Sequence, residues 1–600
     1  METILGIDLG TTNSEVSVIR GNDVVVIEKD GHRLLPSVVG IDLSGNLLVG
    51  HPAKNQAILY PERTIKSIKR KMGEDIRIKL GDQEYSPPEI SAMILRTLRS
   101  YAEESLGQKV SKAVITVPAF FNDTQREATR LAGELAGLDV VRIINEPTAA
   151  SLIYNSDSTQ QETLLVYDLG GGTFDVSIVR VEDGVLEVLA SHGDTHLGGD
   201  DFDQLLFDYV CDTFKKQHKV DLREIPVAVS RVLQAVEEAK KRLSVEPFTQ
   251  IKEEFITEKN GISLHLDMEL SRMDYEEQIL PLLEKTLTCL NDALNDAHLH
   301  PDDIDKVIMV GGASRTPLVH QLLESRLGSK LHGEIDPDLC VTMGAAVQGG
   351  LISGTKIGRV LIDITPHTLG TNVFDPMTNS PFVFSPIIKR NTPIPCSRSN
   401  AYGTLYDKQE AVDIDVYQGE SDDVRQNVLI GHFHLSGLAK VPQGNQIICR
   451  FDLDINGILH VTATEKNTGL AGNITVENVL TEHKTEVNQA FREHLNGFFA
   501  DEEAIPVESE EVVDTELVIG DKNFASQLGL ADGWEKRYAK EAALIQRAVT
   551  FISKVTGDDK KDIEKRIKEL VDAINRNDAD QTTSLVSQLE DLLYYLEDSV

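Results

Sequence analysis

The sequence predicts a multidomain protein: an α/β region, then an antiparallel β region, then a helical tail. Three changes of pattern along the 600 residues indicate this order. Strand-like and helix-like segments alternate up to about residue 350. Apolar and polar residues then alternate from 363 to about 478, and helical spacing begins at about 481. A chain this long exceeds a single hydrophobic core, so several domains are expected.

The first region, residues 1–355, is expected to form one α/β domain. Its apolar strand-like runs are separated by amphipathic helix-like runs, which is typical of a sheet covered by helices. The strands are expected at Val24–Ile27, Ala113–Val117, Leu164–Tyr167 and Lys306–Val310, and two of the helices at Thr124–Gly137 and Val229–Leu243.

The second region, residues 367–480, is expected to form a β domain with one buried face. Apolar residues alternate with charged ones in the segment IICRFDLDI, which gives the period of two expected of a half-buried strand. The side chains expected to point inward are Ile447, Cys449, Phe451, Leu453 and Ile455.

The connection between these regions, residues 356–366, is unusually apolar. Val360–Ile362 is a continuous apolar run with Asp363 behind it, whereas linkers are normally polar. Two interpretations stay open. The run is either the first strand of the β domain, or a linker that docks onto the α/β domain in one state and is released in another.

The tail, residues 481–600, is expected to be helical, with an acidic stretch at 501–516 that we interpret as a solvated linker. Apolar residues recur at helical spacing in two groups. These are Ile563, Ile567, Leu570, Val571 and Ile574, and then Leu585, Leu589, Leu592 and Leu596.

Composition excludes several classes of function. The formal net charge of -37, from 59 basic and 96 acidic residues, argues against nucleic acid as a partner. Five cysteines without a C-x-x-C motif argue against a disulfide framework and a structural zinc site. No apolar run reaches the roughly 20 residues of a spanning helix, and the start does not resemble a signal peptide. We therefore expect a cytoplasmic protein with no membrane partner.

Two similar turns carry the strongest functional signal. Asp8–Thr12 and Asp168–Thr173 each follow an apolar strand and precede another, about 160 residues apart. Glycines let backbone N–H groups approach an anion, and aspartates can hold Mg²⁺ with its waters. Either turn alone is more often a plain hairpin, but the matched pair favours a phosphate site. A third glycine turn, in VIMVGGASR at Val307–Arg315, is expected to wall a nucleoside.

Longer motifs follow one another along the chain: GIDLGTTNS, VITVPAFFNDTQREAT, IINEPTAAS, DLGGGTFDVS, GDTHLGGDDFD, VGGASRTP, GAAVQGG, VDIDVYQGE and DINGILHVTATEKNTG. They resemble the heat shock protein 70 family, the DnaK-type chaperones, and most closely its bacterial HscC-type members. The similarity is close from residue 1 to about 480 and weak beyond. It implies an actin-like ATPase domain, a β-sandwich that binds peptide, and an α-helical lid.

The resemblance implies roles at an ATP/ADP site. Asp8 and Asp168 would position Mg²⁺ and, with Asp175, K⁺. Lys69 would orient the attacking water, although without the resemblance it would be interpreted as an exposed helix lysine. The residues implied in catalysis are Lys69, Glu146, Asp168, Thr173 and Asp175. The residues implied in nucleotide binding are Gly10, Thr11, Thr12, Asn13, Gly170, Gly171, Gly172, Gly198, Gly199, Glu237, Lys240, Ser244, Gly311, Gly312, Arg315 and Asp338.

The resemblance also implies a function: an ATP-dependent chaperone that binds extended, unfolded polypeptides with a J-domain co-chaperone and a nucleotide-exchange factor. With ATP the linker and lid would dock on the ATPase domain and peptide would exchange quickly, and with ADP they would be released. Peptide would contact Val373, Phe374, Tyr402, Leu405, Val412 and Ile414. Coupling between the domains would involve Pro118, Arg126, Arg142, Leu361 and Asp363.

Some residues depart from the family pattern. Glu15 stands where the family usually has a small or apolar residue close to the nucleotide, and Phe374 and Leu405 are bulkier than expected, which could narrow the choice of peptide. A small-molecule kinase of the same superfamily is an alternative, but it gives no reason for the β region. A non-hydrolysing exchange factor is disfavoured because Lys69 and Glu146, among other implied catalytic residues, are present.

Overall fold

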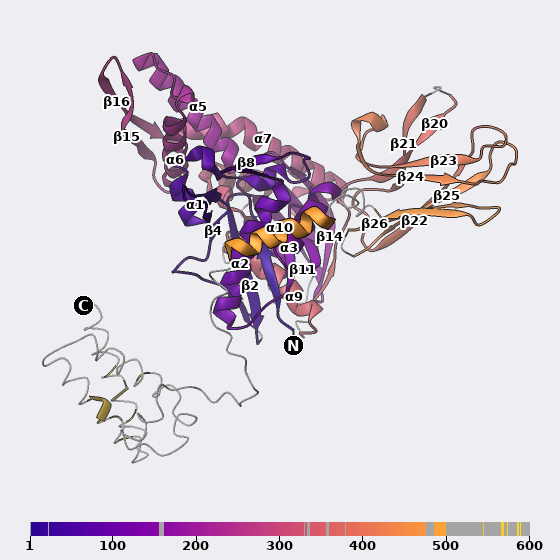
Figure 1. Ribbon diagram of the computed structural model, residues 1–600, viewed down its shortest axis with the longest axis horizontal. Helices are drawn as coiled ribbons and strands as arrows, with labels where there is room; N and C mark the ends of the chain where they lie inside the picture. Colours follow the sequence, from indigo (N-terminus) through magenta and orange to yellow (C-terminus); the bar gives the residue numbers. More distant parts are fainter. Residues whose placement is uncertain are drawn as a thin grey trace. The chain divides into compact units, whose positions relative to one another are not determined.

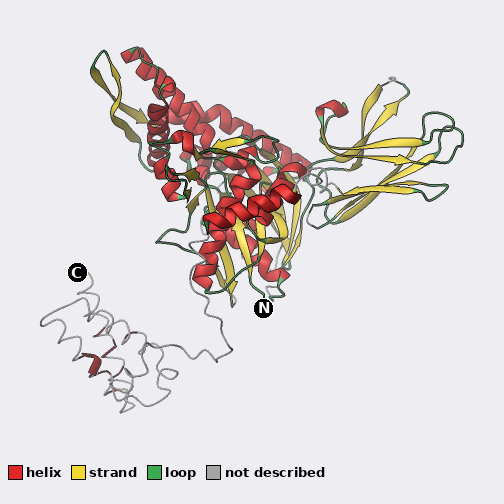
Figure 2. Cartoon of the chain, viewed as in Figure 1, coloured by secondary structure: helices red, strands yellow, loops and turns green. Residues whose placement is uncertain are grey.

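The computed structural model describes residues 2–499, except 22, 155–160, 329, 333–335, 356–358, 378–379, 456 and 476–484, together with ten separate positions between 544 and 589. The chain divides into two compact units, residues 1–502 and 503–600, and each is described by itself. Figure 1 labels the elements in chain order, and Figure 2 separates helices from strands by colour.

The first sheet lies in the N-terminal part of the α/β region. Its strands run in the order β11-β10-β1-β2-β3, with β4 paired to β2. The expected strands at 24–27 and 113–117 are confirmed to within one residue. The bounds are Ile4–Asp8 (β1), Asn13–Arg20 (β2), Asp23–Val26 (β3), Leu35–Pro36 (β4), Lys112–Val117 (β10) and Asp139–Asn145 (β11).

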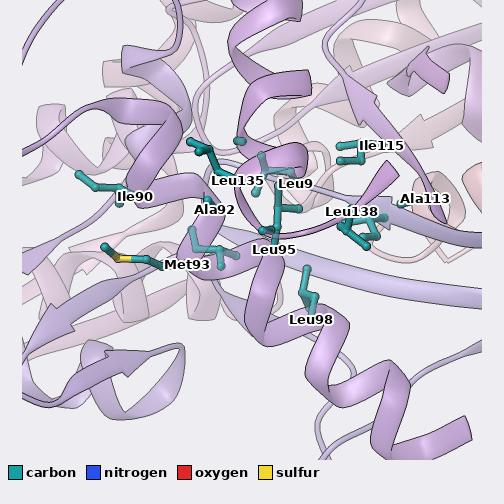
Figure 3. Close-up of a cluster of buried hydrophobic side chains, with 14 of the residues drawn as sticks. Leu9, Ile90, Ala92, Met93, Leu95, Leu98, Ala113, Ile115, Leu135 and Leu138 are labelled. Atoms are coloured by element: carbon teal, nitrogen blue, oxygen red, sulfur yellow. The ribbon is translucent and has the colours of Figure 1, made fainter. Parts of the chain in front are cut away.

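Two helices cover this sheet, and the apolar side chains between the helices and the sheet form a shared core. Helix α2 (Pro87–Leu106) and helix α3 (Asp123–Leu135, expected at 124–137) bury their apolar faces against it. Figure 3 shows Met93 and Leu98 of α2 in the same cluster as Leu9, which follows β1. The first functional turn is therefore held by the domain core. Smaller elements beside this core are β5 (Val39–Ile41), β6 (Leu47–Val49), β7 (Thr64–Ile65), β8 (Ile78–Leu80), β9 (Gln83–Tyr85) and α1 (His51–Gln56).

The second sheet has the order β18-β17-β12-β13-β14-β19. Strands β12 and β13 form the hairpin that carries the second glycine turn, and the strands expected at 164–167 and 306–310 are confirmed as β12 and β17. The bounds are Glu162–Leu169 (β12), Phe174–Glu182 (β13), Val185–Asp194 (β14), Lys306–Val310 (β17), Leu331–His332 (β18) and Val360–Ile362 (β19).

The apolar linker run is strand β19 of this second sheet. It pairs parallel to β14, with Leu361 opposite Leu186. Leu361 packs against the core cluster beneath the sheet, which also contains Val188 and Ile364. Of the two interpretations of the linker, the structure shows docking onto the α/β domain rather than membership in the β domain.

The remaining helices of the α/β region surround the second sheet and a two-stranded extension. Fully buried Phe202 and Tyr275 belong to the core that these helices share. The helix expected at 229–243 is confirmed and begins three residues earlier. The bounds are Gly199–His218 (α5), Pro226–Leu243 (α6), Phe248–Lys259 (β15), Ile262–Ser271 (β16), Arg272–Asp296 (α7) and Pro317–Leu327 (α8).

Helices α4 (Glu146–Ile153) and α9 (Cys340–Ile352) cross with their backbones in direct contact. A Cβ atom on Gly344 would lie 1.8 Å from the carbonyl oxygen of Ala149, so the crossing requires glycine at this point. Strand β1 approaches α9 as closely, because a Cβ atom on Gly6 would lie 2.1 Å from the backbone nitrogen of Ala346.

Replacing Gly344 with alanine is therefore expected to destabilise the α/β domain. Backbone has to move to admit the methyl group, and overpacking of this kind lowers the free energy of unfolding by about 1–3 kcal/mol. Urea unfolding measures the change. Gly497→Ala is the matched control, since Gly497 also lies in a helix but has open space where the Cβ would be, and its midpoint should be unchanged or higher. Equal midpoints for Gly344→Ala and wild type would contradict the prediction.

The β region is a sandwich of two antiparallel sheets, β21-β20-β23-β24 and β22-β25-β26-β27, with Val416 and Phe451 fully buried between them. Four of the five expected inward side chains on β25 are buried. Ile455 is 48% exposed, and this prediction was wrong because β25 ends at Leu453 and Ile455 lies in the following loop. The bounds are Leu369–Asp375 (β20), Ser380–Ile388 (β21), Cys396–Gly403 (β22), Ala411–Gln418 (β23), Val428–Ser436 (β24), Gln446–Leu453 (β25), Leu459–Glu465 (β26) and Ala471–Thr475 (β27).

Helix α10 (Thr485–Phe498) begins the expected lid and packs on the α/β domain. Phe491 and Leu495 are buried in the core that contains α2 and α3, and the Tyr85 hydroxyl lies 3.1 Å from His494 Nε2. Among the helices that the structure describes, none is both long and apolar enough to span a membrane. All five cysteines lie within the described residues and are free thiols.

In the second unit the described positions are helical, and those expected to be apolar contacts are buried: Ile567, Leu570, Leu585 and Leu589. The remaining expected contacts and the acidic stretch 501–516 lie outside the described residues. These contacts are Ile563, Val571, Ile574, Leu592 and Leu596.

Candidate functional site

The two similar turns face each other. A Cβ atom on Gly171 would lie 1.9 Å from Thr12 Oγ1, and one on Gly172 would lie 2.7 Å from Thr11 Cγ2. Any side chain at these glycines would overlap the opposite turn, so the sequence needs glycine there. Within the first turn, a Cβ atom on Gly10 would meet the carbonyl oxygen of Asn13 at 2.0 Å. The internal repeat thus places two glycine turns, each beside an aspartate, directly against each other.

The start of α5 and the third glycine turn close around the second turn. The backbone N–H of Gly199 donates to Gly170 O (2.9 Å), and a Cβ atom on Gly198 would lie 2.5 Å from Gly171. A Cβ atom on Gly311 would lie 2.5 Å from Leu169 O, and Gly311 has a φ of 79°, a conformation that favours glycine. All the predicted glycines therefore gather at one place, where a helix N-terminus also favours an anion.

Helix α6 supplies the side chains predicted to contact adenosine, and they lie beside this glycine cluster. Lys240 Nζ donates to Gly199 O (3.0 Å) and pairs with Asp203 (2.7 Å). Glu237 pairs with Lys54 (3.3 Å) across the cleft, and Ser244 caps the end of the helix. These half-buried contacts exclude the alternative of a freely solvated helix face. Their role in binding adenosine stays a prediction.

The third turn carries its own ion pair. Arg315 Nη2 lies 2.6 Å from Asp338 Oδ2 and 3.2 Å from Asp336 Oδ1, and Gly312 lies against Asp338. Gly312, Arg315 and Asp338 are predicted to complete the purine site, whereas Asp336 is not predicted. The structure places them together at the end of β17.

Lys69 is buried, which the sequence alone would not predict. It lies in the short helix η2 (Ile68–Lys71), is 3% exposed and forms a hydrogen-bonded ion pair with Glu146, 77 residues away. Burial alone would lower the pKa of Lys69, but Glu146 and Asp8 together raise it above its usual value. Burial raises the pKa of Glu146 to about 7, although Lys69 opposes the shift. Lys69 is therefore a fixed positive charge inside the cleft.

Lys69 is surrounded by an excess of carboxyl groups. Asp8, Asp168 and Asp175 have raised pKa values, chiefly because they are buried, and repulsion from Glu146 raises those of Asp168 and Asp175 further. Such a cluster is stabilised by cations, so these residues fit Mg²⁺ and monovalent ions. Within the described residues, no three acidic, histidine or cysteine side chains converge on one metal position. Mg²⁺ would therefore be held largely through waters and phosphates.

Glu15 adds a further carboxyl group to this cluster. It lies directly across the β1–β2 hairpin from Asp8 and hydrogen-bonds to it, and Thr116 Oγ1 donates to Asp8 at 2.8 Å. Burial, and next the neighbouring Asp8, raise the pKa of Glu15 well above its usual value. The departure of Glu15 from the family pattern marked it in the sequence, whereas Thr116 lies within the motif VITVPAFFNDTQREAT but was not singled out.

Asp175 links the carboxyl cluster to the segment after Pro118. The backbone N–H groups of Ala119 and Phe120 donate to the two Asp175 oxygens at 3.2 Å and 3.0 Å. Pro118 is buried directly before them, at the end of β10. Asp175 is thus held by backbone donors, so a movement of Asp175 would displace the segment after Pro118, and a movement of that segment would displace Asp175.

A chain of polar contacts continues from this segment to the linker. Arg126 of α3 donates to Ala119 O (2.9 Å) and to Asn145 Oδ1 (2.6 Å). Asn145 Nδ2 in turn lies 3.1 Å from both oxygens of Asp363, which is buried just after β19. The contacts therefore run without interruption from Asp175 to Asp363. Sequence reasoning proposed Arg126 and Asp363 but missed Asn145.

Arg142 lies near this series of polar contacts but is not part of it. It is buried, and its Nε has no hydrogen-bond partner among the described residues. Burial lowers the pKa of Arg142, and Asp363 partly offsets this. Its predicted role in coupling between the domains stays a prediction.

Other contacts between the α/β domain and the sandwich involve residues that sequence reasoning missed. The Asp123 N–H donates to Gln418 Oε1 (3.2 Å), His367 Nε2 lies 3.0 Å from Phe120 O, and Arg390 pairs with Asp296 (2.9 Å). Each is a single polar residue whose partner lies far along the chain, so spacing carries no signal for it.

The burial of Asp123 predicts that the stability of the folded chain depends on pH. Its buried Oδ2 has no hydrogen-bond partner among the described residues, and burial raises its pKa to about 6, with Arg126 opposing the shift. Because the carboxyl group holds its proton more tightly in the folded state, it contributes to the stability of the folded chain. This contribution is complete below the pKa of the unfolded state, about 4, and is lost as pH rises through the pKa of the folded state, about 6. Asp123→Asn should therefore gain thermal stability relative to wild type between pH 5 and pH 7.5.

Thermal unfolding of both proteins at several pH values measures this gain. The control is Asp42→Asn, because hydrogen bonds from Asn46 lower the pKa of the exposed Asp42, so its difference from wild type should be flat over the same range. A flat difference for Asp123→Asn as well would show that Asp123 ionises freely.

The residues predicted to form the peptide groove lie in the sandwich on or beside β20, β22 and β23. Tyr402, Val412 and Ile414 contribute to one apolar cluster, with Ile414 buried as plain core and the Tyr402 hydroxyl 2.9 Å from Ser385 Oγ. Phe374 and Leu405 are 37% and 59% exposed, and Val373 is half-buried. The exposed pair, rather than Ile414, is therefore available to a ligand.

Comparison with known proteins agrees with this geometry. Residues 4–599 match the family model described as Hsp70 protein. The chain is 43% identical over 598 residues to the chaperone protein DnaK of Thermotoga neapolitana, covering 98% of this chain and 96% of that protein. The DnaK proteins of Thermotoga petrophila and Thermotoga maritima match to the same extent. The HscC-type assignment stays a prediction. Over nearly its whole length, the chain belongs to the Hsp70 family.

Proposed function

We propose that ATP binds between the two facing glycine turns, and that its hydrolysis there controls how tightly the β-sandwich holds an extended polypeptide. As a member of the Hsp70 family, the chain is an ATP-dependent molecular chaperone and an ATPase that uses Mg²⁺. It acts on unfolded polypeptides with J-domain co-chaperones. The finer assignments below rest on the described contacts.

The phosphates would be bound by the backbone N–H groups of the two turns and by the hydroxyl groups of Thr11, Thr12 and Thr173. Mg²⁺, when bound, offsets the negative charge of the phosphates. Asp8 and Asp168 would hold it, and the excess carboxylates leave room for K⁺ beside Asp175. Lys69 would orient the attacking water and stabilise the charge that develops on the phosphate, while Glu146 holds Lys69 in place.

The observation that carries the proposed coupling is the unbroken series of contacts from Asp175 to Asp363. It joins the carboxyl cluster to the residue that follows the docked linker strand β19. The sandwich and α10 also contact the α/β domain, so we assign this docked arrangement to the ATP-bound chain. Loss of the terminal phosphate would change the charge near Asp175 and favour release of the linker.

The domain bounds and the partner sites that we propose are those expected from the sequence. We assign residues 1–355 to the ATPase domain, 356–366 to the linker, 367–480 to the peptide-binding sandwich and 481–600 to the lid. Arg142 and Asp363 would respond to a J-domain partner, and a nucleotide-exchange factor would act on the ATPase domain.

Two measurements test the proposal. ATP hydrolysis should rise when an unfolded peptide and a J-domain protein are both added, and a labelled peptide should dissociate faster with ATP than with ADP. Transfer of phosphate to a small molecule would instead support the kinase alternative. Absence of hydrolysis under all conditions would support a non-hydrolysing exchange factor.

A further inference from the structure

The outer face of the sheet β21-β20-β23-β24 carries two matched histidine–aspartate pairs. Asp413 and Asp415 of β23 lie opposite His434 and His432 of β24. Because side chains alternate along a strand, all four lie on one face, while Ile414, between the aspartates, points into the core. His432 and His434 therefore form a His-x-His pair on a single strand.

Each histidine is oriented by its aspartate. His432 Nδ1 lies 2.5 Å from Asp415 Oδ1, and His434 Nδ1 lies 2.7 Å from Asp413 Oδ1. Asn372 Nδ2 donates to the other oxygen of Asp415 at 3.1 Å. Since a carboxylate accepts a hydrogen bond from Nδ1, the lone pair of each neutral ring lies on Nε2.

The two rings are open to solvent, with 54% and 55% of their side-chain surface exposed. Histidines that bind metal ions usually donate their second ring nitrogen to a carboxylate, which fixes the tautomer and raises the basicity of the ligand. Both histidines have this arrangement, and the spacing of about 6.5 Å between alternate residues of a strand allows the rings to lean toward a common point.

We propose that His432 and His434 bind one divalent late transition-metal ion through their Nε2 atoms, with water completing its coordination. Imidazole ligands suit Zn²⁺, Ni²⁺ and above all Cu²⁺, which binds most tightly in this series. In the part of the chain that the structure describes, no third ligating side chain converges here. The site is therefore an exchangeable surface chelate and not a closed structural site.

Simple charge pairing explains the arrangement less well. Exposed ion pairs contribute only about 0–1 kcal/mol, and either pair alone would give that contribution. Metal binding uses features that charge pairing does not, namely two histidines at alternate positions on one face, each held through Nδ1 so that Nε2 remains for a metal ion. Metal binding at this surface of the sandwich does not depend on the ATPase cycle.

Titration of the full-length, untagged chain with Cu²⁺, followed by electron paramagnetic resonance and by competition with a chelator, tests the proposal. Wild type should bind one equivalent of Cu²⁺, and the spectrum of this bound Cu²⁺ should show two nitrogen ligands. His432→Gln and His434→Gln should each lose this same equivalent, and the double variant should lose no more. The control is His460→Gln, since His460 is exposed and lies opposite Asp452 but has no histidine two residues away. This variant should keep the equivalent.

Unchanged stoichiometry in both single variants would overturn the proposal. Additive losses would overturn it as well, because they would indicate two independent histidines rather than one chelate. Asp413→Asn and Asp415→Asn should weaken Cu²⁺ binding by about 10- to 100-fold if the carboxylates orient the rings. Unchanged affinity in both would contradict that orienting role.

Discussion

Replacing Lys69 with methionine is expected to slow ATP hydrolysis by about 100- to 1,000-fold, the usual effect of removing one preorganised group that stabilises transition-state charge. Lys69 is 3% exposed and held by Glu146, so its charge is fixed within the cleft before the reaction begins. Methionine is apolar and fills similar volume, so the fold should persist. Nucleotide binding should change much less, because the backbone donors of both turns remain.

Single-turnover release of phosphate, measured beside equilibrium nucleotide binding, separates these two effects. Lys71→Met is the matched control, since Lys71 lies in the same short helix but is exposed and pairs with Glu74 at the surface. Its hydrolysis rate should equal that of wild type. If Lys69→Met hydrolysed ATP within a fewfold of the wild-type rate, Lys69 would have no role in the reaction.

Replacing Asp363 with alanine is expected to uncouple peptide release from ATP. Asp363 is buried, accepts hydrogen bonds from Asn145 and faces the positive charges of Arg126 and Arg142. Its removal leaves Asn145 Nδ2 without its acceptor and removes the negative charge that faces Arg126 and Arg142. Losing one member of such a buried network lowers stability by about 3–5 kcal/mol, and here the state that is destabilised is the docked arrangement. ATP should then accelerate peptide dissociation at least tenfold less than in wild type.

Stopped-flow dissociation of a labelled peptide, with ATP and with ADP, measures this loss. Asp363→Asn should be intermediate, because the amide keeps a hydrogen-bond acceptor for Asn145 but not the charge that faces Arg126 and Arg142. Hydrolysis without peptide should persist in both variants, since the carboxyl cluster is untouched. Normal acceleration by ATP in Asp363→Ala would show that the contacts from Asp175 to Asp363 do not carry the coupling.

Much of the fold follows from local pattern. The four strands predicted in the α/β region are found to within two residues because each is a mainly apolar run, and β25 is predicted because its side chains alternate. Ile455 shows the limit of that reasoning. It continues the alternation but is exposed, because its strand has already ended at Leu453. Periodicity does not indicate where backbone pairing stops.

The site is predictable where the signal is repeated and unpredictable where it depends on single long-range contacts. Two turns with the same order of aspartate, glycine and threonine predict a shared phosphate site, and the glycines indeed lie against the opposite turn. Asn145 and Thr116 have no such signal. Each matters only because folding brings it to an aspartate far away in the sequence.

The sequence by itself determined the order of the domains, the glycine turns and the residue types of an ATP site, because these depend on local periodicity and on conformations that only glycine adopts readily. The tertiary structure alone decided the burial of Lys69 and the position of the linker. Lys69 becomes a buried charge only because Glu146 is folded against it. Val360–Ile362 could pair with either neighbouring domain, and the hydrogen bonds that β14 offers place it in the ATPase sheet.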